Sequence, residues 1–192
     1  MRRRRRRYTR GKKESKWNMN MLGNILLWIF QIAVVLLMAF VLVFYAGEQI
    51  SNIGDSMSPT LENGDVVLVN RFVYKVTSPK QGDLVVFRPN GNVNAHFYIK
   101  RVVAGPGDTV QIRDGFLYVN DELMTDLPFG RISNAGMVED TVTVGSEEYF
   151  VIGDNPDSSE DSRYTDIGNV KLSDIEGKAW YVLSPRARRG KL

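Results

Sequence analysis

The chain has no cysteine and only one histidine among its 192 residues. Without cysteine it forms no disulfides and has no thiolate metal ligands, although this absence does not indicate a compartment. A single histidine leaves only carboxylate-rich ligand sets for a metal and makes any imidazole catalysis depend on His96 alone. A hydrolase built from these residues would therefore use a hydroxyl nucleophile activated by a neutral lysine amine.

Acidic residues are nearly absent from the first 47 residues. That stretch holds ten of the 25 basic residues, including the run Arg2–Arg7, but only Glu14 of the 22 acidic residues, so its net charge is +9. The remainder holds 15 basic and 21 acidic residues, a net charge of −6. This asymmetry is typical of a membrane protein whose basic end is cytoplasmic. An arginine run also suits nucleic acid, but no aromatic-interleaved or helical basic face accompanies it, so we expect no nucleic-acid partner.

One long apolar run, Leu22–Ala46, follows the basic end. At about 1.5 Å per residue it would extend roughly 37 Å, enough to cross a hydrocarbon core about 30 Å thick with some tilt. A cleaved signal peptide is the alternative, but its apolar region is usually about 7–15 residues long and ends in a small-x-small site. Bulky Phe44 stands two residues before Ala46, where a small residue is needed. We therefore predict a retained anchor.

The rest of the chain consists of short β-favouring segments separated by turn residues. They are rich in β-branched and aromatic residues and occupy 65–69, 83–87, 109–112, 116–119, 141–144, 149–152 and 178–183, with a helical turn at 171–175. The prediction is a mainly β coiled sheet or barrel preceded by one transmembrane helix. The expected parts are a basic cytoplasmic segment 1–21, an anchor 22–46 and an extracytoplasmic domain 47–192. A surface excursion rich in Gly, Asn and Pro is expected around 124–140.

Five Gly-Asp dipeptides punctuate these segments, at 54–55, 64–65, 82–83, 107–108 and 153–154. Glycine and aspartate both favour turns. We interpret most of these dipeptides as turns and assign them no chemistry individually.

Ser56 is a candidate nucleophile, ten residues beyond the apolar run. It lies in Gly54-Asp55-Ser56-Met57-Ser58-Pro59-Thr60, a restrained turn that could hold a hydroxyl at the edge of a cleft. Neighbouring Ser58 precedes proline, which favours extended geometry. A serine is a poor nucleophile without a base, and on composition alone a surface turn is the plainer interpretation of this stretch.

Lys100 is the candidate base. An ordinary lysine has a pKa near 10.4, and burial among apolar neighbours such as Ile99 and Val102 would lower it. A solvated lysine on a sheet surface is the plainer interpretation. His96 would share a strand face with Tyr98 and Lys100 and is the rival base, although no carboxylate is clearly set to orient it.

A metal site is not predicted. Four carboxylates cluster near the end of the last central segment, at Asp154, Asp157, Glu160 and Asp161. Their spacing lacks the calcium-loop pattern with its terminal glutamate.

Four motifs in order resemble those of the bacterial type I signal peptidases, in a form similar to that of Gram-positive bacteria. These are membrane-anchored Ser-Lys proteases. Ser56-Met57-Ser58-Pro59-Thr60-Leu61 is similar to the nucleophile motif, and Gly82-Asp83-Leu84-Val85-Val86-Phe87 to a structural strand motif. Tyr98-Ile99-Lys100-Arg101-Val102-Val103 resembles the motif that carries the base, and Gly153-Asp154-Asn155 with Ser158 to Arg163 resembles the last one. Each motif alone is weak, but four in order behind one span are a strong signal.

The resemblance implies a role for each matching residue. Ser56 would be the nucleophile, Lys100 the general base, and Ser159 the hydroxyl that orients the lysine amine. Asp154, Asp161 and Arg163 would support the site through polar contacts. The Ser56 backbone N–H would donate to the oxyanion. Gly54 stands where some members place a serine hydroxyl, which leaves the second oxyanion donor unassigned.

The implied function is removal of N-terminal signal peptides from exported preproteins, without metal or organic cofactor. Substrate would add as a strand near Ile53, Met57 and Tyr98. We expect a monomer in the bacterial cell membrane, with a single span, a cytoplasmic N-terminus and an extracytoplasmic catalytic domain, in contact with preproteins and the lipid bilayer. Three alternatives stay open. They are a self-cleaving repressor of related fold, a non-enzymatic module for surface-protein assembly, and a membrane-tethered β binding domain.

Overall fold

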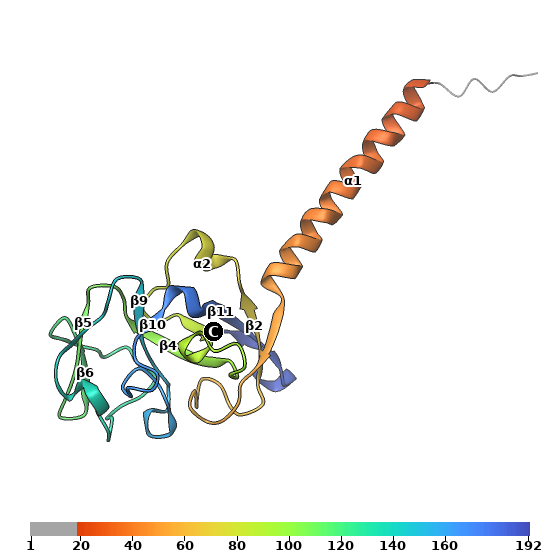
Figure 1. Cartoon of the computed structure of the whole chain (residues 1–192). Coiled ribbons are helices and arrows are strands. Elements are labelled where there is room, and N and C mark those ends of the chain that lie inside the picture. Colours follow the sequence, from red (N-terminus) through yellow and green to blue (C-terminus); the bar gives the residue numbers. More distant parts are fainter. Residues whose placement is uncertain (1–18) are drawn as a thin grey trace, which may run out of the picture. The chain divides into compact units, whose positions relative to one another are not determined.

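The structure, a computed structural model, describes residues 19–192, without the side chains of residues 19, 20 and 44–46. Within this range the chain forms one long helix and a domain of antiparallel strands (Figure 1). The helices are α1 (Met19–Ala46) and α2 (Val73–Val76). The strands are β1 (Glu48–Ser51), β2 (Val66–Asn70), β3 (Leu84–Phe87), β4 (Tyr98–Ala104), β5 (Thr109–Arg113), β6 (Phe116–Val119), β7 (Glu122–Leu123), β8 (Val142–Thr143), β9 (Glu148–Ile152), β10 (Val170–Lys171), β11 (Ile175–Ser184) and β12 (Gly190–Lys191). Short 3₁₀ turns lie at Pro89–Gly91, Gly136–Glu139, Pro156–Ser158, Leu172–Asp174 and Arg186–Arg188.

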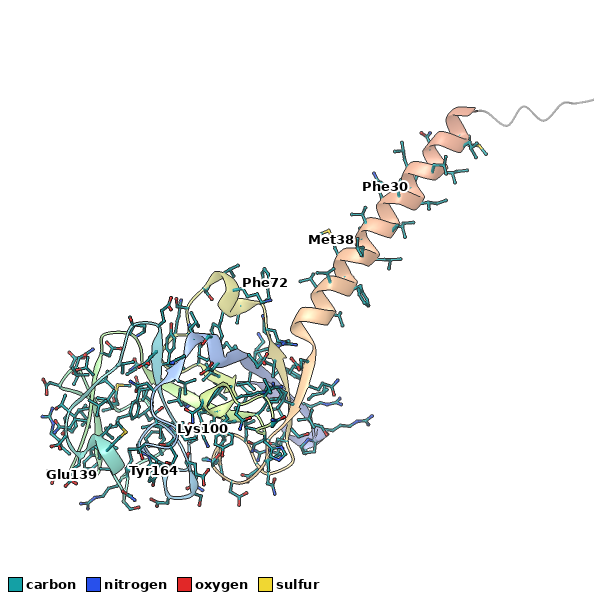
Figure 2. The ribbon with its side chains drawn as sticks, in the orientation of Figure 1. Phe30, Met38, Phe72, Lys100, Glu139 and Tyr164 are labelled. Atoms are coloured by element: carbon teal, nitrogen blue, oxygen red, sulfur yellow. The ribbon has the colours of Figure 1, made fainter. Side chains whose placement is uncertain are left out.

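The helix α1 is apolar around its whole circumference. Its stretch Met21–Val43 has a mean hydropathy of 2.9, and by length and composition it can cross a membrane. Phe30 and Met38 project outward from the helix (Figure 2) and are 66% and 61% exposed. A helix that is apolar on all sides requires apolar surroundings. The predicted span 22–46 coincides with this helix, whereas most of the predicted basic segment, residues 1–18, lies outside the described residues.

A large sheet forms the centre of the folded domain, in the order β1-β2-β11-β3-β4-β9-β10, with β12 paired to β11. Strand β3 is buried on both faces. Since successive side chains point to opposite faces, Leu84 and Val86 join one hydrophobic cluster, and Val85 and Phe87 join another. Strand β4 lies between β3 and β9. A side chain in the middle of β4 is therefore far from either edge of the sheet.

A second sheet has the order β7-β6-β5-β8. Figure 1 shows β5 and β6 at one end of the domain, with β2 and β11 at the other. The segment 124–140, expected as an excursion, contains no strand, and its Ile132 and Val138 are buried in the core of this sheet. The segment therefore covers the second sheet with apolar side chains.

The mainly β fold with one N-terminal apolar helix is confirmed. Each predicted segment of β-branched and aromatic residues overlaps a strand, and the predicted turn at 171–175 contains a 3₁₀ turn at Leu172–Asp174. Several short strands were not predicted, notably β1, whose sequence Glu-Gln-Ile-Ser is mostly polar. It is extended because it pairs with β2 in register Glu48↔Val69 to Ser51↔Val66. Pairing, and not local propensity, specifies such a strand.

Four of the five Gly-Asp dipeptides are turns with glycine in the left-handed region, at Gly54, Gly64, Gly82 and Gly107. Glycine adopts positive φ without a steric penalty. Gly153 is not among them, and its role is different, as described below.

The C-terminal turn clamps the loop that follows β1. Arg188 Nε donates to Asp65 Oδ2 at 3.0 Å, and its Nη2 donates to the carbonyls of Pro59 and Thr60 at 3.1 and 3.2 Å. Asp65 is 2% exposed and also accepts the Glu62 N–H at 2.9 Å. One arginine thus joins residues about 125 positions apart and neutralises a buried carboxylate.

We expect Arg188→Ala to lower the free energy of unfolding by about 1–3 kcal/mol, because the Asp65 carboxylate would lose its charged partner. Denaturant unfolding of the full chain in detergent measures this change. Arg186→Ala, in the same 3₁₀ turn, is the matched control and should change stability by less than about 0.5 kcal/mol. Equal effects of the two substitutions would show that Arg188 is not a clamp.

Candidate active site

Ser56 lies in the loop between β1 and β2, and buried residues of this loop anchor it to the core of the domain. Met57 and Leu61 are fully buried and belong to the hydrophobic cluster on one face of the large sheet. The Leu61 N–H donates to the Met57 carbonyl at 2.8 Å. Asn52, 4% exposed, donates its side-chain amide to the carbonyls of Gly54 and Glu62. The two apolar anchors and the buried amide therefore hold Ser56 at a defined position above the core.

Lys100 reaches Ser56 from the middle of β4. Its Nζ lies 2.7 Å from Ser56 Oγ, a hydrogen-bond distance. Lys100 is 3% exposed (its position in the domain is shown in Figure 2). It pairs across the sheet with Val85 of β3. The two residues are 44 positions apart in sequence and are brought together by the fold.

Burial lowers the pKa of the Lys100 amine from 10.5 to about 8, because a charged amine is disfavoured away from water. The negative charges of Asp161, Glu160 and Asp154 oppose this shift, while Arg163 reinforces it. The neutral amine, which can accept a proton, is therefore about a tenth of the total at pH 7 and about half at pH 8.

The loop after β9 supports Ser56 through its backbone. The Asn155 N–H donates to the Ser56 carbonyl at 3.0 Å, and the Asn155 side chain donates to the Asp55 carbonyl at 3.2 Å. A Cβ atom on Gly153 would lie 2.4 Å from the Ser56 carbonyl oxygen and 2.3 Å from Ser159 Oγ. Only glycine permits this close approach of Gly153 to both residues.

Two ion pairs hold the same loop. Asp154 accepts two hydrogen bonds from Arg101, the residue after Lys100, at 2.7 and 2.5 Å. Arg163 and Asp161 are fully buried and are joined by two hydrogen bonds of 2.8 and 3.0 Å. Arg163 also donates to backbone carbonyls at Asn134, Pro156 and Ser159. Each carboxylate is therefore neutralised by its own guanidinium.

A cleft of about 320 Å³ opens beside the Ser56–Lys100 pair. Its lining combines apolar, polar and charged residues, namely Asn52, Ile53, Gly54, Asp55, Ser56, His96, Phe97, Tyr98, Ile99, Lys100, Ser158 and Glu160. Ile53 is 65% exposed on its rim. Ile53 and Tyr98, predicted to bind substrate, thus face this cleft, whereas Met57 does not line it and is buried beneath Ser56.

The four predicted supporting residues differ in the contacts that they make. Asp154, Asp161 and Arg163 form the ion pairs above. Ser159 is buried, but its Oγ has no hydrogen-bond partner among the described residues, so its contact with Lys100 stays a prediction.

The oxyanion donors are likewise only partly assigned. The Ser56 N–H makes no hydrogen bond within the described structure. The Gly54 N–H donates to Asn63 Oδ1 at 3.0 Å.

His96 and the acidic cluster take other roles. His96 is exposed on the cleft lining, and among the described residues the hydrogen bond to Ser56 Oγ comes from Lys100. The four clustered carboxylates have separate partners: Asp154 with Arg101, Asp161 with Arg163, Asp157 with Ser133 and Glu160 with Tyr98. Among the described residues no group of three or more His, Asp or Glu side chains is placed to hold a metal.

Sequence reasoning missed three contributors to the site. Asn155 and Gly153 lie within a quoted motif, but their contacts with Ser56 depend on backbone approach, which a sequence pattern does not display. Nothing in the motif that contains Arg101 indicates its pairing with Asp154, because that contact joins β4 to the loop after β9.

The sequence is similar to known proteins over most of its length. Residues 25–183 match the family described as signal peptidase, peptidase S26. Signal peptidase I P of Bacillus subtilis subsp. natto is 33% identical over 174 residues, covering 86% of this chain and 92% of the relative. Signal peptidase IB of Staphylococcus aureus strain COL is 33% identical over 183 residues, covering 84% and 90%. A crystal structure of a signal peptidase I from Enterococcus faecalis V583 is 29% identical, covers 54% of this chain and 97% of that one, and has a TM-score of 0.43.

We expect Lys100→Met to be more stable than the parent at pH 7, because it removes a buried amine. In the parent the folded-state pKa of about 8 lies below the unfolded value near 10.4. The unfolded chain therefore binds more protons between these two values, so the parent's stability rises with pH across that window. The corresponding penalty below pH 8 is roughly 3 kcal/mol.

Denaturant unfolding at pH 7, 8.5 and 10 tests this expectation. The methionine variant should lose the rise between pH 8 and 10. A variant that is less stable at pH 7 and still shows the parent's rise would contradict the burial argument.

Proposed function

The chain belongs to the signal peptidase family, peptidase S26, and from this premise we propose that it cleaves preproteins with a Ser56–Lys100 dyad while anchored in a membrane. The observation that carries the proposal is the 2.7 Å separation of Lys100 Nζ and Ser56 Oγ. The lowered pKa of the Lys100 amine, about 8 through burial, adds to it. A hydroxyl beside an amine that is partly neutral near neutral pH is an activated nucleophile.

The proposed reaction is amide hydrolysis through an acyl-enzyme. Lys100 takes the Ser56 proton as Oγ attacks the scissile carbonyl carbon, and the amine then donates that proton to the leaving nitrogen. Water, deprotonated by the same amine, hydrolyses the ester and restores Ser56. The unengaged Ser56 N–H is the proposed donor to the carbonyl oxygen that becomes negatively charged. The Gly54 N–H already donates to Asn63 Oδ1. The second hydrogen-bond donor to the oxyanion therefore has to be another group of this loop or one that becomes available only when substrate is bound.

Ser159 is the proposed orienting residue for the amine. Its hydroxyl is buried and free of hydrogen bonds among the described residues. A rotation about its Cα–Cβ bond changes the direction of the hydroxyl without moving the backbone. In the substrate complex the hydroxyl would accept a hydrogen bond from the Lys100 amine and so hold it toward Ser56.

The substrate proposed for the cleft is an extended signal peptide. Ile53, just after β1, and Tyr98, at the start of β4, both line the cleft. A peptide strand bound beside these residues would use backbone hydrogen bonds for affinity and shallow pockets for small side chains. The limited cleft volume of about 320 Å³ favours small residues next to the scissile bond.

The proposed location follows from the charge pattern and α1. Ten basic residues precede the apolar stretch, which favours a cytoplasmic N-terminus. The folded domain would then lie on the extracytoplasmic side of a bacterial membrane. There exported preproteins emerge with their signal peptides still in the bilayer, so enzyme and substrate are confined to one surface.

We expect Ser56→Ala and Lys100→Ala each to reduce preprotein cleavage at least 10³-fold while the circular dichroism spectrum is kept, because each removes one half of the proposed dyad. Cleavage of a purified preprotein with a small-x-small site, in detergent, is the measurement. Ser58→Ala is the matched control, since Ser58 bonds to Glu62 and not to Lys100. Retained cleavage in Lys100→Ala would remove the lysine from the mechanism.

The rate should depend on pH through the base. Protonated Lys100 cannot accept a proton, so kcat/KM should rise with pH to a midpoint near 8 and then level off. A pH–rate profile from pH 6 to 10 measures the midpoint. His96→Ala should keep it, and a midpoint that disappears with His96 would transfer the base role to that histidine.

A further inference from the structure

Glu160 is a charged residue of the cleft lining to which the proposed mechanism assigns no function. Four charged groups from one loop act on the Lys100 amine, namely Asp161, Glu160, Arg163 and Asp154. Asp161 is paired with Arg163, and Asp154 is paired with Arg101. Among the described residues no cation is paired with Glu160. Its carboxylate therefore acts on Lys100 without a neutralising partner.

The hydrogen bond that Glu160 does make comes from a neutral group. Tyr98 OH donates to Glu160 Oε2 at 2.9 Å. Glu160 is exposed, and both residues line the same cleft as Ser56 and Lys100. The carboxylate of Glu160 is thus fixed at the cleft wall by a phenol and not by an ion pair.

Tyr98 also lies next to the amine. It precedes Lys100 by two residues on β4, so the two side chains share a face of the strand. The centre of the Tyr98 ring is 5.5 Å from Lys100 Nζ. Tyr98 therefore contacts the surroundings of the amine with its ring and holds the nearby carboxylate with its hydroxyl.

We propose that Tyr98 holds the Glu160 carboxylate away from direct contact with Lys100. Glu160 then acts on the amine only through a weak, solvent-screened interaction and forms no ion pair with it. This inference rests on the proposed dyad function. Tyr98 and Glu160 are positioning residues here, since neither takes part in bond making.

The physical argument compares two positions of one carboxylate. In direct contact with the amine it would stabilise the ammonium strongly and raise the pKa of Lys100, which removes the neutral base at neutral pH. Held by Tyr98 and exposed to water, it stabilises the ammonium only weakly, because solvent screens it. The other titratable groups that face the cleft are Asp55 and His96, and neither shares this tether.

The test is a double-mutant cycle read as the midpoint of the kcat/KM–pH profile. Glu160→Gln keeps a hydrogen-bond acceptor for Tyr98 but removes the charge, so the midpoint should fall by about half a pH unit. Tyr98→Phe keeps the ring but releases the carboxylate, so the midpoint should rise by at least about half a unit. In the double variant the rise caused by Tyr98→Phe should vanish, because there is no carboxylate left to pair.

Asp157→Asn is the matched control. Asp157 is an exposed carboxylate of the same loop that bonds to Ser133 and does not line the cleft, so its removal should leave the midpoint in place. Because His96 and Asp55 also face the cleft, the cycle is repeated in a His96→Ala and in an Asp55→Asn background. The shifts should be the same in both.

The outcomes separate this inference from the proposed function. If Ser56→Ala and Lys100→Ala are inactive but the Tyr98→Phe midpoint does not rise, or rises equally in the Glu160→Gln background, the tether is wrong and the dyad stands. A lower rate with an unmoved midpoint would also overturn the tether, since it indicates a purely structural role. If Lys100→Ala keeps full activity, the dyad itself fails.

Discussion

The structure around Ser56 depends on one constraint, which is that the amine of Lys100 is almost completely removed from water. At 3% exposure the ammonium form is disfavoured, and the pKa falls to about 8. The position in the middle of β4, between β3 and β9, produces this burial. A lysine at an edge of the same sheet would stay solvated and charged. Burial of the Lys100 amine therefore lowers the stability of the folded protein, and the same burial makes part of the amine neutral near neutral pH.

The surrounding charges have to be arranged so that they do not reverse this effect. A buried charge without a partner is costly, and an unpaired carboxylate beside the amine would also raise its pKa. Both problems are met by pairing each deep carboxylate with its own arginine, Asp161 with Arg163 and Asp154 with Arg101. These pairs also fasten the loop after β9 to β4 and to the segment near Asn134. The remaining carboxylate, Glu160, is at the solvent-exposed wall of the cleft, where water screens it.

Long-range contacts hold the loop that carries Ser56. Its apolar residues Met57 and Leu61 are buried in the large sheet's core, its backbone is held by Asn155, and its far end is clamped by Arg188. These contacts come from three separate parts of the chain. A hydroxyl held from several sides stays aligned with Lys100, and alignment of reacting groups is a large part of catalysis. The fold therefore holds Ser56 and Lys100 together although they are 44 positions apart in sequence.

Local chemistry along the chain was sufficient to predict the apolar helix and most of the strands, whereas the choice of Ser56 and Lys100 came from the resemblance of four motifs in order and stays a prediction. Those features depend on runs of residue type, on turn residues at regular places and on short motifs in order. The 2.7 Å approach of the two side chains, the burial that lowers the pKa of Lys100 and the pairing of each carboxylate were decided only by the tertiary structure. The edge strand β1, the glycine requirement at Gly153 and the Arg188 clamp belong to the same group. The physical reason is common to all of them: each is an interaction between segments far apart in sequence, and its energy exists only once the sheet has brought those segments together.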